Sequence, residues 1–206
     1  MPMKLHFQPT HPHRERGLTL LEVLITIVIL AFGLLGIAGL QARMQVAEIE
    51  SYQRAQAIVL LQDMVDRINA NRRNAMSYVT ASPVGTDGTL DCSAPATVAA
   101  KDLCEWNNAL LGATEVKSGG TCTSADPSGC IGAMIDARGC VINTAATMPL
   151  EFMVSVVWQG LAPTAAPPST ITCGSGSYTP DTTRRAVVAR VKIGCLQNDP
   201  GGVTCL

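Results

Sequence analysis

The stretch RERGLTLLEVLITIVILAFGLLGIAGLQ, residues 14–41, decides the fold of this chain. Residues 23–42 contain no Asp, Glu, Lys or Arg, and a single carboxylate, Glu22, comes directly before them. An α-helix rises about 1.5 Å per residue, so about 20 apolar residues cross a hydrocarbon core of about 30 Å. The stretch therefore predicts a membrane-spanning helix. An ordinary single-pass anchor and an uncleaved signal peptide would share this hydropathy.

The position of the one acid argues against those two ordinary interpretations. Glu22 lies near the N-terminal edge of the apolar run, shortly after Gly17. An ionised carboxylate within an apolar helix costs about 2.5 to 3.5 kcal/mol on insertion scales, so such a residue usually has a partner. The apolar stretch itself supplies no cation. The alternative is that Glu22, being close to the helix end, extends its carboxylate to the membrane interface.

Residues 17–22, GLTLLE, resemble the class III signal of type IV pilins and type II secretion pseudopilins, a Gly followed by an apolar residue and T-L-x-E. The resemblance implies that prepilin peptidase cuts between Gly17 and Leu18 on the cytoplasmic side and N-methylates Leu18. Leu18 departs from the more common Phe, which the family tolerates. The freed amine of Leu18 could then pair with Glu22 of a neighbouring subunit, which implies an assembly role for Glu22.

The resemblance extends beyond the signal. Residues 33–41, GLLGIAGLQ, and residues 54–72, RAQAIVLLQDMVDRINANR, are similar to the minor pilins called type IV pilus modification protein PilV. This similarity implies a minor pilin that initiates or caps a pilus with other minor pilins and the major pilin, and a tip adhesin is a further candidate partner. A type II secretion minor pseudopilin stays as the alternative, because residues 17–22 do not separate the two systems.

These features predict four segments along the chain. Residues 1–17 form a cleaved cytoplasmic leader, 18–42 a transmembrane half of a helix, 43–78 its amphipathic half, and 79–206 a periplasmic, loop-rich β domain with disulfides. The basic leader would stay in the cytoplasm, which predicts a bacterial inner-membrane protein with its C-terminal domain in the periplasm. The leader holds three of the 15 basic and one of the 16 acidic side chains, so the remainder is slightly acidic and a nucleic-acid partner is not expected.

Three glycines, Gly33, Gly36 and Gly39, recur at every third position of the anchor. Each weakens a helix interior by about 0.5 to 1 kcal/mol relative to alanine. Small residues at this spacing can let membrane helices approach closely, although the pattern is not a strict GxxxG. The family resemblance implies instead that the glycines provide helix flexibility, because pilin helices commonly loosen at this level in a filament.

Beyond residue 43 the helical pattern becomes amphipathic. Ile58, Leu61, Val65 and Ile68 repeat at intervals of three and four, and no proline interrupts residues 18–82. We therefore expect one helix over residues 18–77.

The composition then changes to loops, within which shorter elements can be recognised. The patterns predict a short helix at residues 101–111, a hairpin around 136–139, and strands at 152–158 and 186–193. Residues 161–183 contain four prolines and predict a long loop. The expected fold is α+β and pilin-like, with the long N-terminal helix packed on a small antiparallel sheet of three or four strands with disulfide-bonded loops.

All eight cysteines lie after the predicted long helix: Cys92, Cys104, Cys122, Cys130, Cys140, Cys173, Cys195 and Cys205. An even count on the far side of a membrane predicts disulfides. Zinc is the rival interpretation and fits poorly, because no C-x2-C pair occurs. The count leaves connectivity open. Closeness in sequence favours Cys92 with Cys104, Cys122 with Cys130 and Cys195 with Cys205, which leaves Cys140 with Cys173.

The residue inventory also bears on catalysis. All three histidines, His6, His11 and His13, lie in the leader, so Ser-His-Asp and Cys-His catalysis and His-ligated zinc are excluded from residues 18–206. We find no nucleophile with a nearby base and no phosphate-binding glycine loop, so we expect no enzyme, no catalytic residue, no metal and no cofactor. Loops on a rigid scaffold often carry recognition, so a tip-located adhesin or binding module is the alternative from another class.

Overall fold

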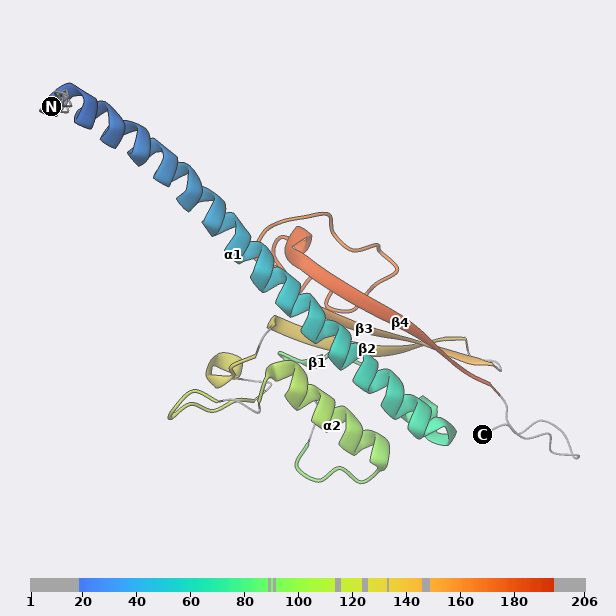
Figure 1. The fold of residues 1–206 in the computed structure, drawn as a ribbon. Coiled ribbons are helices and arrows are strands. Elements are labelled where there is room, and N and C mark those ends of the chain that lie inside the picture. Colours follow the sequence, from blue (N-terminus) through green and yellow to red (C-terminus); the bar gives the residue numbers. More distant parts are fainter. Residues whose placement is uncertain are drawn as a thin grey trace, which may run out of the picture. The chain divides into compact units, whose positions relative to one another are not determined.

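Helix α1 (Leu20–Ala70, 51 residues) is the longest element of the computed structural model (Figure 1). The structure describes residues 19–88, 90, 92–113, 116–123, 126–132, 134–145 and 149–194. The chain divides into two compact units, Met1–Gln45 and Val46–Leu206, and α1 contributes residues to both. The sequence contains no proline between residues 18 and 82, which permits an unbroken helix of this length.

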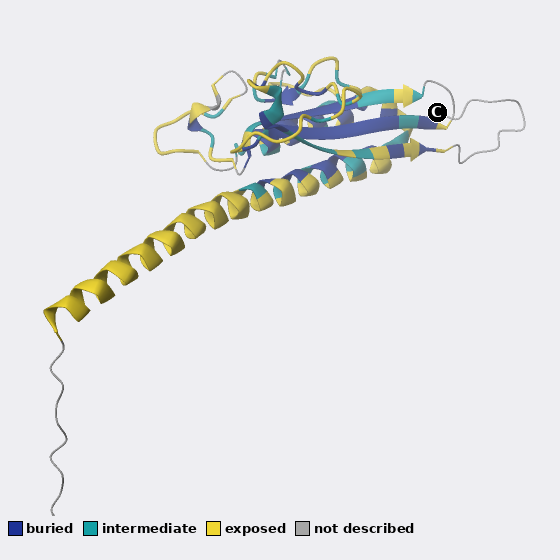
Figure 2. Ribbon diagram, turned by 90° about the horizontal axis from the view of Figure 1, so that it is seen from above, coloured by how far each residue is buried: buried dark blue, intermediate teal, exposed yellow. Residues whose placement is uncertain are grey.

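In the first unit, no described side chain is covered by its own chain. Residues 19–45 are all exposed, including Leu20 at 84% and Phe32 at 72% (Figure 2). Helix α1 is also the one described helix that is long and apolar enough to cross a membrane. A helix that is apolar on every side is stable when lipid or other helices surround it, so the first unit has the surface expected of a membrane-anchoring segment.

The described residues of the second unit form one antiparallel sheet of four strands in the order β1-β2-β3-β4. The strands are β1 (Val84–Gly85), β2 (Ile135–Ala145), β3 (Leu150–Gln159) and β4 (Arg184–Ile193). Alternate residues of β3 bury one face of the sheet against a stripe of α1, and Trp106 completes this core. The main contributors are Ala57, Leu61, Met64, Ile68, Trp106, Phe152, Val154, Val156 and Trp158. The α+β pilin-like fold and both strands predicted from the sequence are therefore confirmed.

Helix α2 (Val98–Leu111) begins three residues before the predicted start. Thr97 caps it, because its Oγ1 accepts a hydrogen bond from the Ala100 N–H at 3.1 Å. Gly112 ends it in the left-handed conformation, with φ of 71°. A Cβ at Gly112 would lie 2.3 Å from the Cα of Gly132, so both the conformation and the close approach require glycine.

The predicted hairpin around residues 136–139 is wrong. Residues 135–145 form a single strand, β2, with a register irregularity between Ile135 and Arg138 and a positive φ of 55° at Asp136. Gly139 suggested a turn, but it lies within the strand. The position requires glycine because a Cβ there would be 2.3 Å from Cη2 of Trp106. The glycine therefore makes room for the packing of α2 against the sheet.

The predicted end of the long helix also needs correction. Helix α1 ends at Ala70 instead of residue 77, and a 3-10 helix, η1 (Arg72–Tyr78), follows. Asn71 leaves the helical region, with φ of −111° and ψ of 43°, and its side chain donates to the Tyr78 hydroxyl at 3.2 Å. Asparagine side chains compete for local hydrogen bonds in this way, which favours a helix boundary.

The predicted stripe of α1 is confirmed at Leu61 and Ile68, which are buried, and is wrong at Ile58. Ile58 is 50% exposed, whereas Ala57 and Met64 are fully buried. Apolar spacing alone could not distinguish these neighbouring faces of the helix.

Three disulfides hold the loops of the second unit. They join Cys92 to Cys104, Cys122 to Cys130, and Cys140 to Cys173. These are the pairs that closeness in sequence favours, and Cys195 and Cys205 lie outside the described residues. The third bond fastens the loop at residues 160–183 to β2, where both cysteines are buried together with Tyr178 and Val157.

Candidate functional site

The N-terminal end of α1 positions the acid that the sequence singles out. Glu22 lies in the first turn, and its backbone N–H donates to Oγ1 of Thr19 at 3.3 Å. Thr followed three residues later by Glu is a capping-box pattern, and a carboxylate in the first turn also favours the helix dipole. The sequence prediction missed this local role of Glu22, although the T-x-x-E spacing was available. Gly17 and Leu18, the predicted cleavage residues, lie outside the described residues.

Glu22 forms no ion pair within the described part of the chain. Arg43 is the next cation along α1, many turns further on. The carboxylate is therefore held in an apolar helix without a compensating charge from the residues that the structure describes. Such a group can accept a cation or an amine from another chain.

The three glycines of the anchor form an uninterrupted part of α1. A Cβ built at Gly33, Gly36 or Gly39 meets nothing within 4 Å. No contact within the described chain therefore requires glycine at these positions. A need for glycine at these positions would come from an approaching helix or from backbone flexibility. These are the two alternatives that the sequence left open.

A charged cluster joins the C-terminal end of α1 to α2. Arg67 pairs with Asp63 at 2.9 Å, Asp102 at 2.9 Å and Glu105 at 2.6 Å. Tyr78 donates its hydroxyl proton to Asp102. Burial, reinforced by this hydrogen bond, raises the pKa of Tyr78 to about 12. The cluster connects α1, η1 and α2 through hydrogen bonds and ion pairs, which is the arrangement expected of a structural connection.

A second cluster surrounds Arg138 of β2. Its guanidinium pairs with Asp87 at 2.6 Å and Asp136 at 2.7 Å, and lies 5.1 Å from the ring centroid of Tyr178. The Tyr178 hydroxyl donates to the Asp136 carbonyl at 2.7 Å. Burial raises the pKa of Tyr178 to about 12, partly opposed by Arg138. This cluster fastens the loop at residues 160–183 over the sheet.

No group of three or more His, Cys, Asp or Glu side chains suited to a metal occurs among the residues that the structure describes. The described cysteines are all in disulfides. The exposed anchor with its uncompensated acid has a surface suited to association with lipid and with other helices.

Two comparisons with protein families agree with this geometry. The family model described as "Prokaryotic N-terminal methylation motif" matches residues 12–38, which include the predicted cleavage residues and Glu22. The model described as "Type IV pilin Tt1218" matches residues 39–134, from the anchor through α2. No curated protein and no solved structure matches the chain significantly. With its methylation motif, its apolar helix and its small antiparallel sheet, the chain is similar to the type IV pilins over residues 12–134.

Proposed function

We propose that this pilin acts as a minor pilin, a subunit of the bacterial inner membrane that helps to initiate or cap a pilus. Prepilin peptidase removes residues 1–17 by cutting after Gly17 and then methylates Leu18. The N-terminal helix afterwards joins other minor pilins and the major pilin. The functional segments are the leader at residues 1–17, the membrane-spanning part at 18–42, the amphipathic part at 43–78 and the periplasmic domain at 79–206.

The observation that carries the proposal is the uncovered apolar surface of residues 19–45, in which Glu22 is the only acid. Lipid can surround such a surface before assembly, and neighbouring helices can replace the lipid afterwards. Glu22 gains a partner when the amine of a processed Leu18 on an adjacent subunit reaches it. The desolvation of that pair is offset only if the two charges meet with good geometry. Processing would in this way be coupled to assembly.

The basic side chains of the leader support the proposed orientation. Lys4, Arg14 and Arg16 precede the apolar segment, and positively charged flanks are retained in the cytoplasm. The C-terminal domain would then lie in the periplasm, an oxidising compartment in which its disulfides form. The family itself is structural and not enzymatic, so cleavage and methylation are reactions performed on this chain.

A type II secretion pseudopilin is the second candidate within the same class. The match described as a type IV pilin over residues 39–134 favours the pilus. The similarity of residues 33–41 and 54–72 to PilV-type minor pilins favours it too.

The test is the N-terminus of the full-length chain, recovered with a C-terminal tag from membranes and from sheared pili. Intact-mass and N-terminal analysis should find N-methylated Leu18 in both fractions. In a matched strain that lacks prepilin peptidase, residues 1–17 should remain and the chain should be missing from pili. Retention of the leader in the strain with the peptidase would refute the proposal. Recovery in secretion pseudopili instead of pili would favour the second candidate.

A further inference from the structure

The second unit contains a groove between the helix and the sheet, at the level where β4 begins. Its volume is about 380 Å³. Ala47, Ser51 and Arg54 of α1 form one wall, and Trp158 and Arg185 form the other. Ala47 and Ser51 lie one turn apart on the same helix face. Their small side chains leave the helix surface low at this point, which creates room for a side chain from outside.

One acid of the groove is already compensated. Oε1 of Glu50 accepts hydrogen bonds from the Leu161 and Ala162 N–H groups at 3.1 and 3.3 Å and from Nη2 of Arg185 at 3.1 Å. Arg185 also donates to the Ala162 carbonyl at 2.6 Å. Glu50 and Arg185 thus neutralise each other and hold the start of the loop at residues 160–183.

One charged group of the groove has no partner. Arg54 is exposed and forms no ion pair or hydrogen bond within the described part of the chain. Trp158 also lines the groove, but it is 3% exposed and its indole Nε1 is buried, so this N–H is not offered to a ligand. The groove therefore presents one uncompensated positive charge. A ligand that compensates this charge is an anion.

We propose that this groove receives a carboxylate side chain from the helix of a neighbouring pilin subunit. The proposal rests on the proposed function, because it requires assembly with other pilins. A carboxylate can bind a guanidinium through two parallel hydrogen bonds. Arg is also one of the residue types that recur at the centres of protein interfaces.

The chain itself displays an acid of the required kind. Glu48 lies on α1 almost two turns before Arg54, is exposed, and has no ion pair among the residues that the structure describes. A helix that carries an unpaired acid and an unpaired cation at different levels is suited to head-to-tail contacts. Such contacts repeat without closing and generate filaments. This complementarity favours a pilin helix over a lipid phosphate as the occupant.

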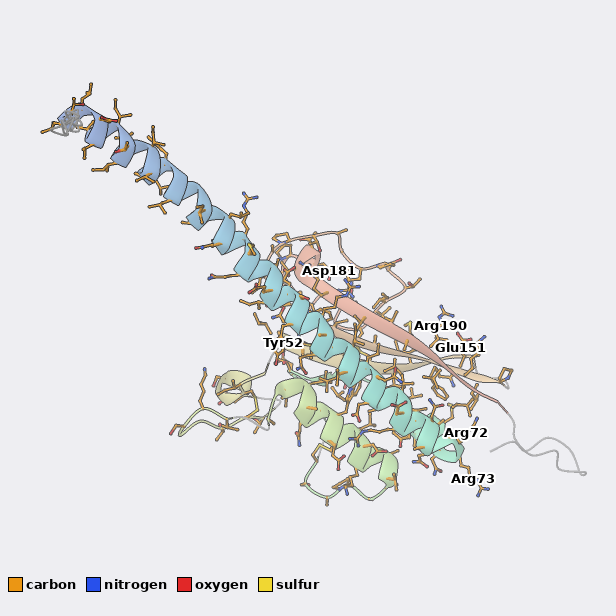
Figure 3. All side chains as sticks on the ribbon, in the orientation of Figure 1. Tyr52, Arg72, Arg73, Glu151, Asp181 and Arg190 are labelled. Atoms are coloured by element: carbon orange, nitrogen blue, oxygen red, sulfur yellow. A yellow bond between two sulfur atoms is a disulfide. The ribbon has the colours of Figure 1, made fainter. Side chains whose placement is uncertain are left out.

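The test is site-specific photocrosslinking of the full-length chain in cells that assemble pili. The benzophenone amino acid p-benzoylphenylalanine replaces Tyr52, which is 58% exposed, adjoins Ser51 and lies on α1 (Figure 3). We expect a crosslink to an acidic helix peptide of another pilin subunit, identified by mass spectrometry. Arg54→Glu should lower its yield by at least about tenfold, because charge reversal replaces attraction by repulsion. Arg54→Lys should retain most of it.

Arg73→Glu is the matched control. Arg73 is exposed and, like Arg54, has no ion pair within the described residues, but it lies on η1 away from the groove. This variant should leave the yield unchanged. Replacing the crosslinked acid of the partner by Arg should restore the yield of the Arg54→Glu chain.

Three results would overturn the inference: a crosslink to phospholipid, a pilin crosslink that Arg54→Glu leaves intact, or an equal loss in Arg73→Glu. Each of these results overturns the inference only if the wild-type chain is processed and present in pili. A wild-type chain that keeps its leader or is missing from pili instead contradicts the proposed function, so the two failures are distinguishable.

Discussion

At the scale of single residues, Glu22 has a local role in the helix and a proposed intermolecular role. Its backbone N–H bonds to Thr19, and its position in the first turn complements the helix dipole. Its charge, however, has no cation within the described chain. These two roles depend on different atoms of the residue, so substitutions can separate them.

Glu22→Gln should retain the capping pattern and remove the charge. We expect normal membrane insertion and at least about tenfold less subunit in sheared pili, because the proposed pair with the amine of Leu18 cannot form. Quantitative immunoblotting of membrane and pilus fractions measures both quantities. Thr19→Ala is the control, since it removes the cap at a cost of about 1 kcal/mol and keeps the acid. Equal losses in the two variants would assign the effect to the helix cap.

Gly139 shows how a tertiary contact determines a single residue. Gly139→Ala should lower the free energy of unfolding by about 1 to 3 kcal/mol, because the added Cβ would lie 2.3 Å from Cη2 of Trp106. Denaturant titration of the detergent-solubilised chain, followed by tryptophan fluorescence, measures the change. Gly194→Ala is the matched control, since a Cβ there meets nothing within 4 Å. Similar stability of the two variants would contradict the packing argument.

At the scale of elements, α1 carries two different environments along one helix. Its residues in the first unit are exposed throughout, whereas its residues in the second unit bury a stripe against the sheet. The glycine triplet belongs to the exposed part, where no packing within the chain restricts it. The arginines Arg72 and Arg73 follow the C-terminal end of the helix (Figure 3), where positive charge complements the dipole.

Replacing Gly33, Gly36 and Gly39 together by alanine should stiffen α1 without a clash inside the chain. Each substitution should stabilise the helix by about 0.5 to 1 kcal/mol. Hydrogen exchange of the membrane-embedded chain should become slower across these residues. If flexibility is needed in the filament, the amount of subunit in pili should fall by at least about tenfold, because the three substitutions together stabilise the helix by about 1.5 to 3 kcal/mol. Ala31→Gly, the control, should give faster local exchange. Unchanged exchange in the triple variant would exclude a flexible segment.

At the scale of the whole molecule, the second unit depends on connections between distant segments. The disulfide from Cys140 to Cys173 and the cluster around Arg138 both fasten the loop at residues 160–183 to β2. A loop of this length contributes little apolar burial of its own. A disulfide that closes it stabilises the folded state by about 2 to 4 kcal/mol. The tyrosines of the two charged clusters make part of this stability sensitive to pH.

Alkaline pH should destabilise the second unit. Burial raises the pKa of Tyr178 to about 12 from an ordinary value of 10.0. The folded chain therefore retains a proton that the unfolded chain releases, and this contribution is complete below pH 10 and lost as the pH rises towards 12. The thermal midpoint, followed by circular dichroism, should fall over that window. Tyr178→Phe should show a shallower fall than wild type, and an equal slope would contradict the assignment.

Several features follow from local patterns in the sequence. The anchor, the strands at residues 152–158 and 186–193, and the α+β class were predictable because apolar periodicity reports how each segment meets its surroundings. The pilin family was recognisable from residues 17–22, because the signal is short and contiguous. None of these inferences requires knowing which distant residues touch.

Other features were decided only by tertiary structure. Gly139 suggested a turn, yet it lies in β2. The residue is a glycine because Trp106 from α2 occupies the space that a Cβ would need. The groove at Arg54 likewise exists because residues of α1, β3 and β4 meet there. A sequence by itself determines which helices, strands and caps neighbouring residues can form, since those interactions are local. Which glycine accommodates a ring and which arginine lacks a partner depend on contacts between residues far apart in the chain, and only the packed fold establishes them.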